Sequence, residues 1–136
     1  MDYKIEYLQD TEFDLPSLVE AILTYCHTTG EDAIEILKKA LECKSNPYYC
    51  TVLLLNEGNC VEGFIIGWLL QKINTAFVGA VYNVSTKKGG MVLNKFEQWC
   101  TDYSVKTVEG IVKDRILPLS EMYGFKKKYN VIEKEI

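Results

Sequence analysis

Hydrophobic and polar residues alternate at the start of the chain, and the hydrophobic positions then change to helical spacing. Tyr3, Ile5 and Tyr7 alternate with polar neighbours, a pattern that predicts a half-buried β-strand. Asp14 is placed to cap the helix that follows, and Pro16 lies in its first turn, where proline is tolerated. The apolar residues of this helix recur at helical spacing and predict one buried face: Leu15, Leu18, Val19, Ile22, Leu23 and Cys26.

A second helix is predicted over residues 28–43, "TTGEDAIEILKKALEC". Acidic residues open this segment and lysines close it, which suits the positive N-terminal end and the negative C-terminal end of a helix dipole. Ile34, Leu37 and Leu41 are expected to line its buried face.

Three apolar runs follow, over residues 50–55, 60–70 and 75–84, and short stretches rich in turn residues separate them. Short turns between β-rich runs predict antiparallel neighbours in a sheet. Gly63, Gly67 and Gly79 lie inside these runs, where glycine indicates a bulge or the close approach of another group to the backbone.

The last third of the chain predicts a helix over residues 90–103, with a buried face formed by Val92, Leu93, Phe96, Trp99, Cys100 and Tyr103. A strand (106–113), a short helix (117–124) that stops at Gly124, and a final strand (125–136) complete the order β-α-α-β-β-β-α-β-α-β. The β-α-β crossover should make its two strands parallel. We therefore expect an α+β fold with an α/β-type mixed central sheet and helices on both faces.

The composition is that of a globular protein, with 48% hydrophobic and 25% charged residues among 136. This length suits a single domain spanning residues 1–136. No apolar run approaches the roughly 20 residues of a membrane span, and the N-terminal residues lack the layout of a secretory signal. We expect a soluble cytoplasmic protein that does not bind a membrane.

The five cysteines include no Cys-x-x-Cys pair, so we expect buried thiols rather than a disulfide framework. His27, the only histidine, directly follows Cys26. Because neighbours on a helix point in different directions, we do not expect these two side chains to act as a catalytic pair. A structural zinc site needs four ligands, and no metal site is expected either.

The net charge of −4 is unevenly distributed along the chain. Residues 1–84 carry 5 basic and 12 acidic side chains, whereas residues 85–136 carry 10 basic and 7 acidic ones. A basic C-terminal part favours a compact anionic ligand there. Nucleic acid is not expected as a partner, because it usually requires a more strongly basic surface overall.

One segment combines the features of a phosphate site. Lys87 and Lys88 precede Gly89 and Gly90, and the predicted helix continues with Met91. The unpaired N–H groups of a helix start bind anions, glycines allow a close approach, and lysines add positive charge. The alternative is a glycine turn in which Ser85 or Thr86 caps the helix and the lysines are solvated, and the local residues leave both interpretations open.

The order of the elements resembles that of the GNAT fold, the Gcn5-related N-acetyltransferases, over nearly the whole chain. "VSTKKGG" stands where that family has Gln/Arg-x-x-Gly-x-Gly/Ala, the loop that binds the pyrophosphate of acetyl-CoA, and "MVLNKFEQWC" resembles the helix after it. "LSEMYGF" resembles the later Leu-Tyr-x-x-x-Gly-Phe motif. Three positions depart from the family: Val84 stands where it has Gln or Arg, Lys87 replaces the first loop glycine, and Ser120 replaces the tyrosine that protonates the departing thiolate.

The resemblance implies a site along the fourth strand and the helix after it. Its expected CoA-binding residues are Val81, Tyr82, Asn83, Val84, Lys87, Lys88, Gly89, Gly90 and Met91. A bulge in residues 80–84 would direct backbone N–H groups. The expected catalytic residues are Tyr123, Ser120 and Tyr82, although Tyr123 is also placed to pack as an apolar residue. Glu62 and Glu109 are either bases or solvent-facing residues of their strands.

Two functions follow from the resemblance. The first is an N-acetyltransferase in which an amine, on a small molecule or a protein, directly attacks the thioester of acetyl-CoA. The second is a non-catalytic GNAT-fold protein that serves as a CoA-binding or protein-interaction module. The compact length resembles the short GNAT proteins of phages and bacteria, so a host cytoplasm is also consistent. The sequence leaves the acceptor and a homodimer open.

Overall fold

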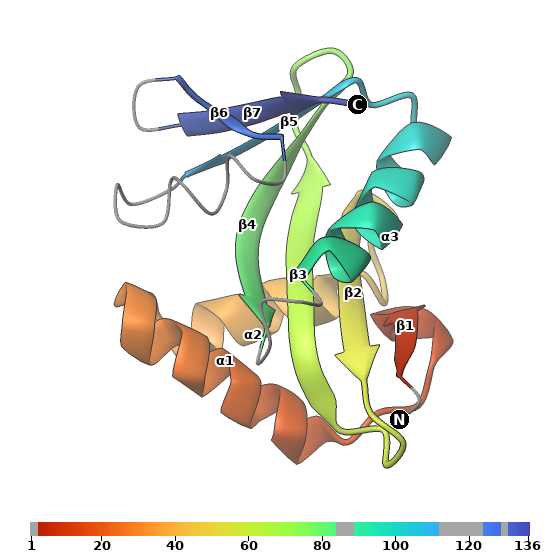
Figure 1. Cartoon of the computed structure of the whole chain (residues 1–136), viewed down its shortest axis with the longest axis vertical. Coiled ribbons are helices and arrows are strands. Elements are labelled where there is room, and N and C mark those ends of the chain that lie inside the picture. Colours follow the sequence, from red (N-terminus) through yellow and green to blue (C-terminus); the bar gives the residue numbers. More distant parts are fainter. Residues whose placement is uncertain (1–2, 84–88, 112–123, 129–130) are drawn as a thin grey trace.

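The computed structural model describes residues 3–83, 89–111, 124–128 and 131–136 (Figure 1). Their elements in chain order are β1 (Lys4–Tyr7), the 3-10 helix η1 (Leu8–Asp10), α1 (Leu15–Thr29), α2 (Ala33–Glu42), β2 (Tyr49–Leu55), β3 (Val61–Leu69), β4 (Thr75–Asn83), α3 (Gly89–Asp102), β5 (Thr107–Ile111), β6 (Lys126–Lys128) and β7 (Val131–Glu135). None of the helices within these ranges combines the length and the apolar character that a membrane span requires.

All the described strands belong to one mixed sheet in the order β1-β2-β3-β4-β5-β7-β6. Neighbouring strands are antiparallel except β4 and β5, which are parallel from the pair Thr75 and Thr107 to the pair Val78 and Gly110. The two parallel strands come directly before and after α3 in the chain, so the predicted β-α-β crossover is confirmed. The expected α+β architecture is confirmed with it.

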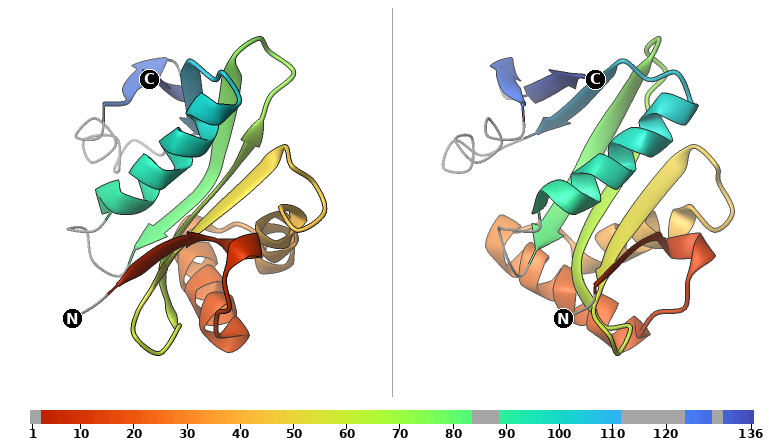
Figure 2. Two further views of the ribbon diagram at one scale, coloured as in Figure 1. Left: turned by 90° about the vertical axis from the view of Figure 1, so that its right-hand side faces the viewer. Right: turned by 45° about the vertical axis from the view of Figure 1, so that its right-hand side comes forward.

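The two faces of the sheet carry different helices (Figure 2). On one face, Leu18 and Ile22 of α1 pack with Ile36 of α2 and Phe64 of β3. On the other face, residues of α3 pack against the neighbouring strands, with Phe96 fully buried there. Each such buried side chain contributes roughly 1.5–3 kcal/mol by leaving water, so helices on both faces are needed to cover a sheet that is apolar on both sides.

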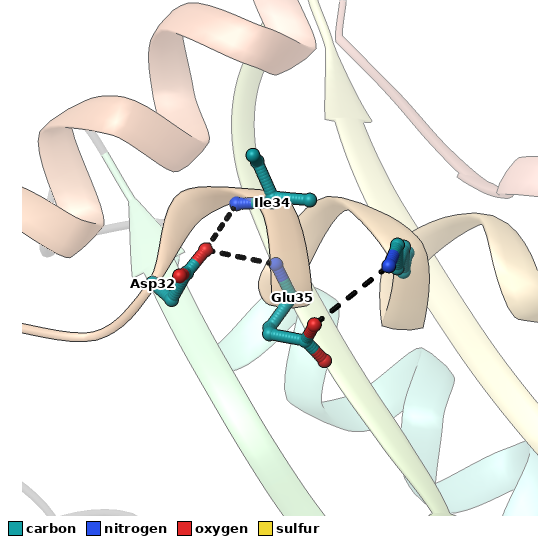
Figure 3. A network of polar contacts seen from close by, with 4 residues as sticks. Asp32, Ile34 and Glu35 are labelled. Carbon is teal, nitrogen blue, oxygen red and sulfur yellow. Dashed lines mark hydrogen bonds and ion pairs between the residues drawn. The ribbon is translucent and has the colours of Figure 1, made fainter.

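The boundary between the first two helices differs from the prediction. Thr28 and Thr29 belong to α1, and Gly30 ends it in the left-handed conformation with φ 79°. Its N–H donates to the carbonyl of Cys26 at 2.8 Å, the closure that glycine permits after a helix. Asp32 then caps α2, with its Oδ1 accepting from the N–H groups of Ile34 at 2.8 Å and Glu35 at 3.2 Å (Figure 3).

The buried face of α2 also differs from the prediction. Ile36 and Ala40 are buried and Leu37 and Leu41 pack beside them, but Ile34 is 65% exposed. Ala33, in the same turn, does pack against the cluster. Ile34, however, lies about 160° around the helix from Ile36 and about 120° from Ala40, outside the face that packs on the sheet. In the same way Tyr103, expected on the buried face of the third helix, follows the last residue of α3 and is 40% exposed.

The final segment, predicted as one strand over residues 125–136, forms two strands. β6 pairs antiparallel with β7, so the chain reverses direction between Lys128 and Val131 and the predicted single strand is not formed. Phe125 is buried in the cluster beneath α3, and Lys134 of β7 forms a 2.7 Å ion pair with Glu97 of α3. Gly124 has φ 90°, as a helix-ending glycine requires, but the predicted helix before it lies outside the described residues.

Gly67 of β3 permits the close approach of α3 to the sheet. A Cβ at this position would lie 2.5 Å from the ring of Phe96 and 2.6 Å from the backbone oxygen of Phe77. We therefore expect Gly67→Ala to lower the free energy of unfolding by about 1–3 kcal/mol, because backbone atoms cannot yield as a flexible side chain can. Urea unfolding measures this change. The control is Gly58→Ala, where the nearest atom lies at 3.6 Å, and an equal loss in both variants would contradict the packing explanation.

Candidate functional site

β4 and β5 part midway along β4 (Figure 1). Their pairing ends at Val78 and Gly110, although β4 continues to Asn83 and β5 to Ile111. From residue 80 onward, β4 therefore has β3 as its ladder partner on one side and no ladder partner on the other side among the described residues. Such an unpaired strand edge presents backbone N–H and C=O groups to a ligand.

A β-bulge lies at the point of parting. Gly67 pairs with Val78, and the preceding residue Ile66 pairs with Ala80, so Gly79 is an extra residue in β4. The bulge predicted within residues 80–84 thus occurs one residue earlier. Its glycine was already indicated by the sequence as a position of irregular or closely approached backbone.

Two aromatic side chains from other elements hold the bulge. The indole of Trp68 covers the position that a Cβ of Gly79 would occupy, and Trp68 itself stacks on Phe77 with ring centroids 5.2 Å apart. The hydroxyl of Tyr25, on α1, donates to the carbonyl of Gly79 at 3.4 Å. The sequence analysis missed both residues, because nothing near Gly79 in the sequence identifies partners 11 and 54 positions away.

The end of β4 carries three of the expected site residues. Val81 is 44% exposed, and its partner Ile65 belongs to the α3-side cluster, which places Val81 on the α3 face of the sheet. The ring of Tyr82 packs on Phe64 at 5.8 Å on the opposite face. Asn83 lies over Gly63, and its Oδ1 is buried without a hydrogen-bond partner among the described residues. A buried acceptor of this kind is costly unless a further group completes it.

α3 begins shortly after β4 ends. Gly89 and Gly90 are its first residues, and Met91 after them is 42% exposed. The first turn of a helix offers unpaired N–H groups with partial positive charge, and glycine leaves them open to a ligand. The unpaired edge of β4 and the start of α3 thus form a site suited to an extended ligand with an anionic end.

Solved structures resemble the chain over nearly its whole length. The N-acetyltransferase PaiA from Thermoplasma acidophilum, solved in complex with coenzyme A, matches with a TM-score of 0.75 and 18% identity over 100% of both chains. Tetrahymena Gcn5 matches with a TM-score of 0.72 and 14% identity, over 100% of this chain and 96% of that one. A GNAT-family acetyltransferase from Staphylococcus aureus Mu50 matches with a TM-score of 0.74 and 14% identity, over 98% of this chain and 99% of that one.

The chain has the GNAT fold. Identities of this size establish the architecture and leave the activity to be argued from the site. No protein-family model matches the sequence, and no curated protein matches it either.

Several expected residues of the GNAT site lie outside the described residues. These are Val84, Lys87 and Lys88 of the loop before α3, and Ser120 and Tyr123 of the predicted short helix. Their placement in the site stays a prediction.

Glu62 and Glu109, considered as bases in a GNAT site, both have partners. Glu62 is the extra residue of a second bulge, in β3, and accepts hydrogen bonds from Asn56 at 2.9 Å and from Tyr3 at 3.4 Å. Glu109 is partly buried and forms a 2.6 Å ion pair with Lys72 of the β3–β4 hairpin. Both carboxylates therefore have structural roles within the sheet, and neither is oriented by a contact with the unpaired edge of β4.

The thiols are placed as the sequence predicted, except for Cys60. Cys26, Cys43, Cys50 and Cys100 are buried, whereas Cys60 is intermediate in exposure. Cys26 is buried and the adjacent His27 is exposed, so the two side chains do not form a pair. Within the described residues, no group of three or more His, Cys, Asp or Glu side chains is arranged to hold a metal ion.

A surface hollow among the described residues lies away from this site. It measures about 420 Å³ and is lined at the start of β2 and the end of α3, by residues that include Tyr7, Tyr49 and Trp99. Because β2 and β4 both lie antiparallel to β3, the start of β2 is at the sheet end where β4 begins, opposite Asn83. The hydroxyl of Tyr7 is already used in donating to the carbonyl of Lys95 at 3.2 Å.

Burial should make four of the five cysteines unreactive. Burial raises the pKa of Cys100 to about 12, and it also raises the pKa of Cys26, Cys43 and Cys50 above the ordinary range. Because the thiolate is the reactive form, we expect one fast-reacting thiol per native chain at pH 8, assigned to Cys60, when an aromatic disulfide reagent is added. In the unfolded chain, all five cysteine thiols should react with the reagent. A Cys60→Ser variant that keeps a fast thiol would contradict the assignment.

Proposed function

We propose that the protein binds acetyl-CoA along the unpaired edge of β4 and transfers the acetyl group to an amine. The observation that carries the proposal is the parting of β4 from β5 next to the Gly79 bulge, with α3 starting at two glycines close by. The likeness to acetyltransferases of the same fold, one of them in complex with coenzyme A, supports this choice of ligand.

The residues of the chain divide the binding between two regions. The unpaired backbone of residues 80–83 would pair with the amide groups of the pantetheine arm, as an added strand does. Val81 and Met91, both partly exposed, offer apolar contact beside that edge. Lys87, Lys88, Gly89 and Gly90 would hold the pyrophosphate at the start of α3, where backbone N–H groups and lysine charges act together.

The chemistry is an attack of the neutral amine on the thioester carbonyl. The new C–N bond forms as the C–S bond breaks, the amine loses one proton, and the departing thiolate gains one. Backbone N–H groups beside the bulge would stabilise the negative charge that develops on the carbonyl oxygen, a contribution that usually exceeds any other in acyl transfer. Tyr123, or a water held by Ser120, would supply the proton to the thiolate, with Tyr82 as a further candidate.

Ligand binding would be tested first, by two titrations, and acetyl transfer would be tested afterwards. Calorimetry with CoA and with acetyl-CoA measures binding, and a screen of small amines and of lysine-containing peptides for thiol release then measures transfer. Binding of CoA without thiol release on any amine would instead favour a CoA-binding module, a function consistent with Ser120 at the position of the family's tyrosine.

Charge reversal at both loop lysines tests the phosphate site. We expect Lys87→Glu with Lys88→Glu to weaken CoA binding at least tenfold, about 1.4 kcal/mol, because charge-assisted contacts to the pyrophosphate are lost. The matched control reverses Lys44 and Lys106, which are exposed near the other end of α3. Equal affinities of the loop variant and the wild type would exclude a phosphate site in this loop.

Tyr123→Phe tests the proton donor, because the substitution removes the hydroxyl and keeps the ring. If Tyr123 protonates the thiolate, turnover should fall by up to about 10²–10⁴-fold while the melting temperature stays unchanged. The leaving thiol is a moderate acid, with a pKa near 8.5 for an ordinary thiol, so the effect belongs at the lower end of that range. Full turnover in the variant would assign the Tyr123 ring to packing.

A further inference from the structure

Tyr25 reaches from α1 to the exact peptide group at which β4 changes partners. Its hydroxyl donates to the Gly79 carbonyl at 3.4 Å, and its ring meets the ring of Phe64 edge-on, with centroids 5.9 Å apart and planes 66° apart. The ring is partly buried against the α1-side cluster. Packing of the ring therefore fixes where the hydroxyl can lie, and the hydroxyl contacts the bulge rather than water alone.

The hydrogen bond controls the orientation of a whole peptide group. The Gly79–Ala80 peptide is trans, and a trans peptide is planar, so its carbonyl and its N–H point in opposite directions. Holding the carbonyl toward α1 therefore prevents the peptide plane from turning. Trp68 covers Gly79 from the same face and fills the space beside its Cα. The anchored peptide and the ladder with β3 together set the direction of the following backbone, residues 80–83.

The protonation state of Tyr25 suits a permanent donor. Burial, and after it a hydrogen bond with the Glu31 side chain, raises the pKa of the Tyr25 phenol well above its ordinary value of 10.0, so the Gly79 carbonyl shares the hydroxyl proton with that carboxylate. The hydroxyl consequently keeps its proton across the physiological pH range and acts as a donor rather than as a base. A length of 3.4 Å exceeds the usual 2.7–2.8 Å of a hydroxyl donor, so the bond is a weak one and the packing of the ring contributes to holding the hydroxyl at this carbonyl.

We propose that Tyr25 is a positioning residue for acyl transfer: by holding the Gly79 carbonyl, it aims the unpaired N–H groups of residues 80–83 at the carbonyl oxygen of the bound thioester. The inference rests on the proposed function and extends it, because it assigns a role in the reaction to α1, which otherwise only covers the sheet. In this role Tyr25 acts through the backbone of β4 and not by contact with the acyl group or the amine.

The test compares CoA, which lacks the acyl carbonyl, with acetyl-CoA labelled with ¹³C at that carbonyl. In the wild type, isotope-edited infrared spectra should show the bound carbonyl stretch at lower wavenumber than in free acetyl-CoA. Tyr25→Phe keeps the ring on Phe64 and should lose at least half of that shift. Its affinity for acetyl-CoA should fall about three- to tenfold, the effect of one hydrogen bond, while its affinity for CoA stays within about twofold.

The matched control is Tyr103→Phe, the same chemical change on a 40% exposed tyrosine beyond the end of α3, and it should leave the spectrum and both affinities unchanged. A carbonyl stretch and affinities in Tyr25→Phe equal to those of the wild type would overturn the role of Tyr25 and leave the proposed function standing. A wild type that binds neither CoA nor acetyl-CoA would overturn both.

A second measurement does not depend on how the variant folds. In wild-type protein labelled with ¹⁵N, acetyl-CoA should shift the amide resonance of at least one of residues 80–83 in a way that CoA does not, because only the thioester offers an acceptor to that N–H. Identical shifts with the two ligands would contradict the aimed N–H group, and the role of Tyr25 with it.

Discussion

The extra residue at Gly79 is the constraint on which the arrangement around β4 depends. β4 must stay paired with β3 along its length and must also separate from β5, and one inserted residue in β4 accompanies this change of direction. Only glycine fits, because Trp68 occupies the space of a side chain there. Trp68 is in turn packed against Tyr49 at 5.5 Å and lies 5.0 Å beneath the ammonium of Lys39, so α2 and β2 also support the bulge.

On the opposite face of the sheet, a glycine also permits a close contact, but this contact positions a helix rather than a bulge. Gly67, the β3 partner of Val78, leaves room for Phe96, and this contact draws α3 close to the sheet. The Glu97–Lys134 ion pair, partly shielded from water, ties the same helix to β7. Because α3 is held along its length, its first residues are fixed relative to the end of β4. The two strand glycines thus set the two halves of the candidate site, one through the bulge and the other through the helix.

Local patterns predicted most of the fold because local physics determines it. Alternation and helical spacing located the strands and helices, and Asp14 caps α1 as expected, accepting from the N–H of Ser17 at 3.0 Å. The errors arose where tertiary context decides. Apolar residues lie on more than one side of α2, and only the folded chain shows that Ile36 and Ala40 face the core while Ile34 does not. No glycine or proline lies between Phe125 and Ile136 to indicate that this segment divides into β6 and β7. The contact between Tyr25 and Gly79 joins elements that only the folded chain brings together.

These contacts indicate which groups an acetyltransferase with this chain would most need for activity: the proton donor to the thiolate or the backbone donors to the carbonyl oxygen. An acid for the thiolate is of modest value, since an ordinary thiol with a pKa near 8.5 leaves without much help at neutral pH. The charge that develops on the carbonyl oxygen, in contrast, needs hydrogen-bond donors that the protein supplies. The loss of a single preorganised donor typically lowers kcat by about 10²–10³-fold. Serine in place of the family's tyrosine at position 120 is therefore compatible with catalysis if the backbone donors are well aimed. The support of Gly79 by Tyr25 and Trp68 is then the feature on which activity would depend most, because a backbone N–H cannot be retuned by exchanging one side chain for another and is oriented only by what packs around it.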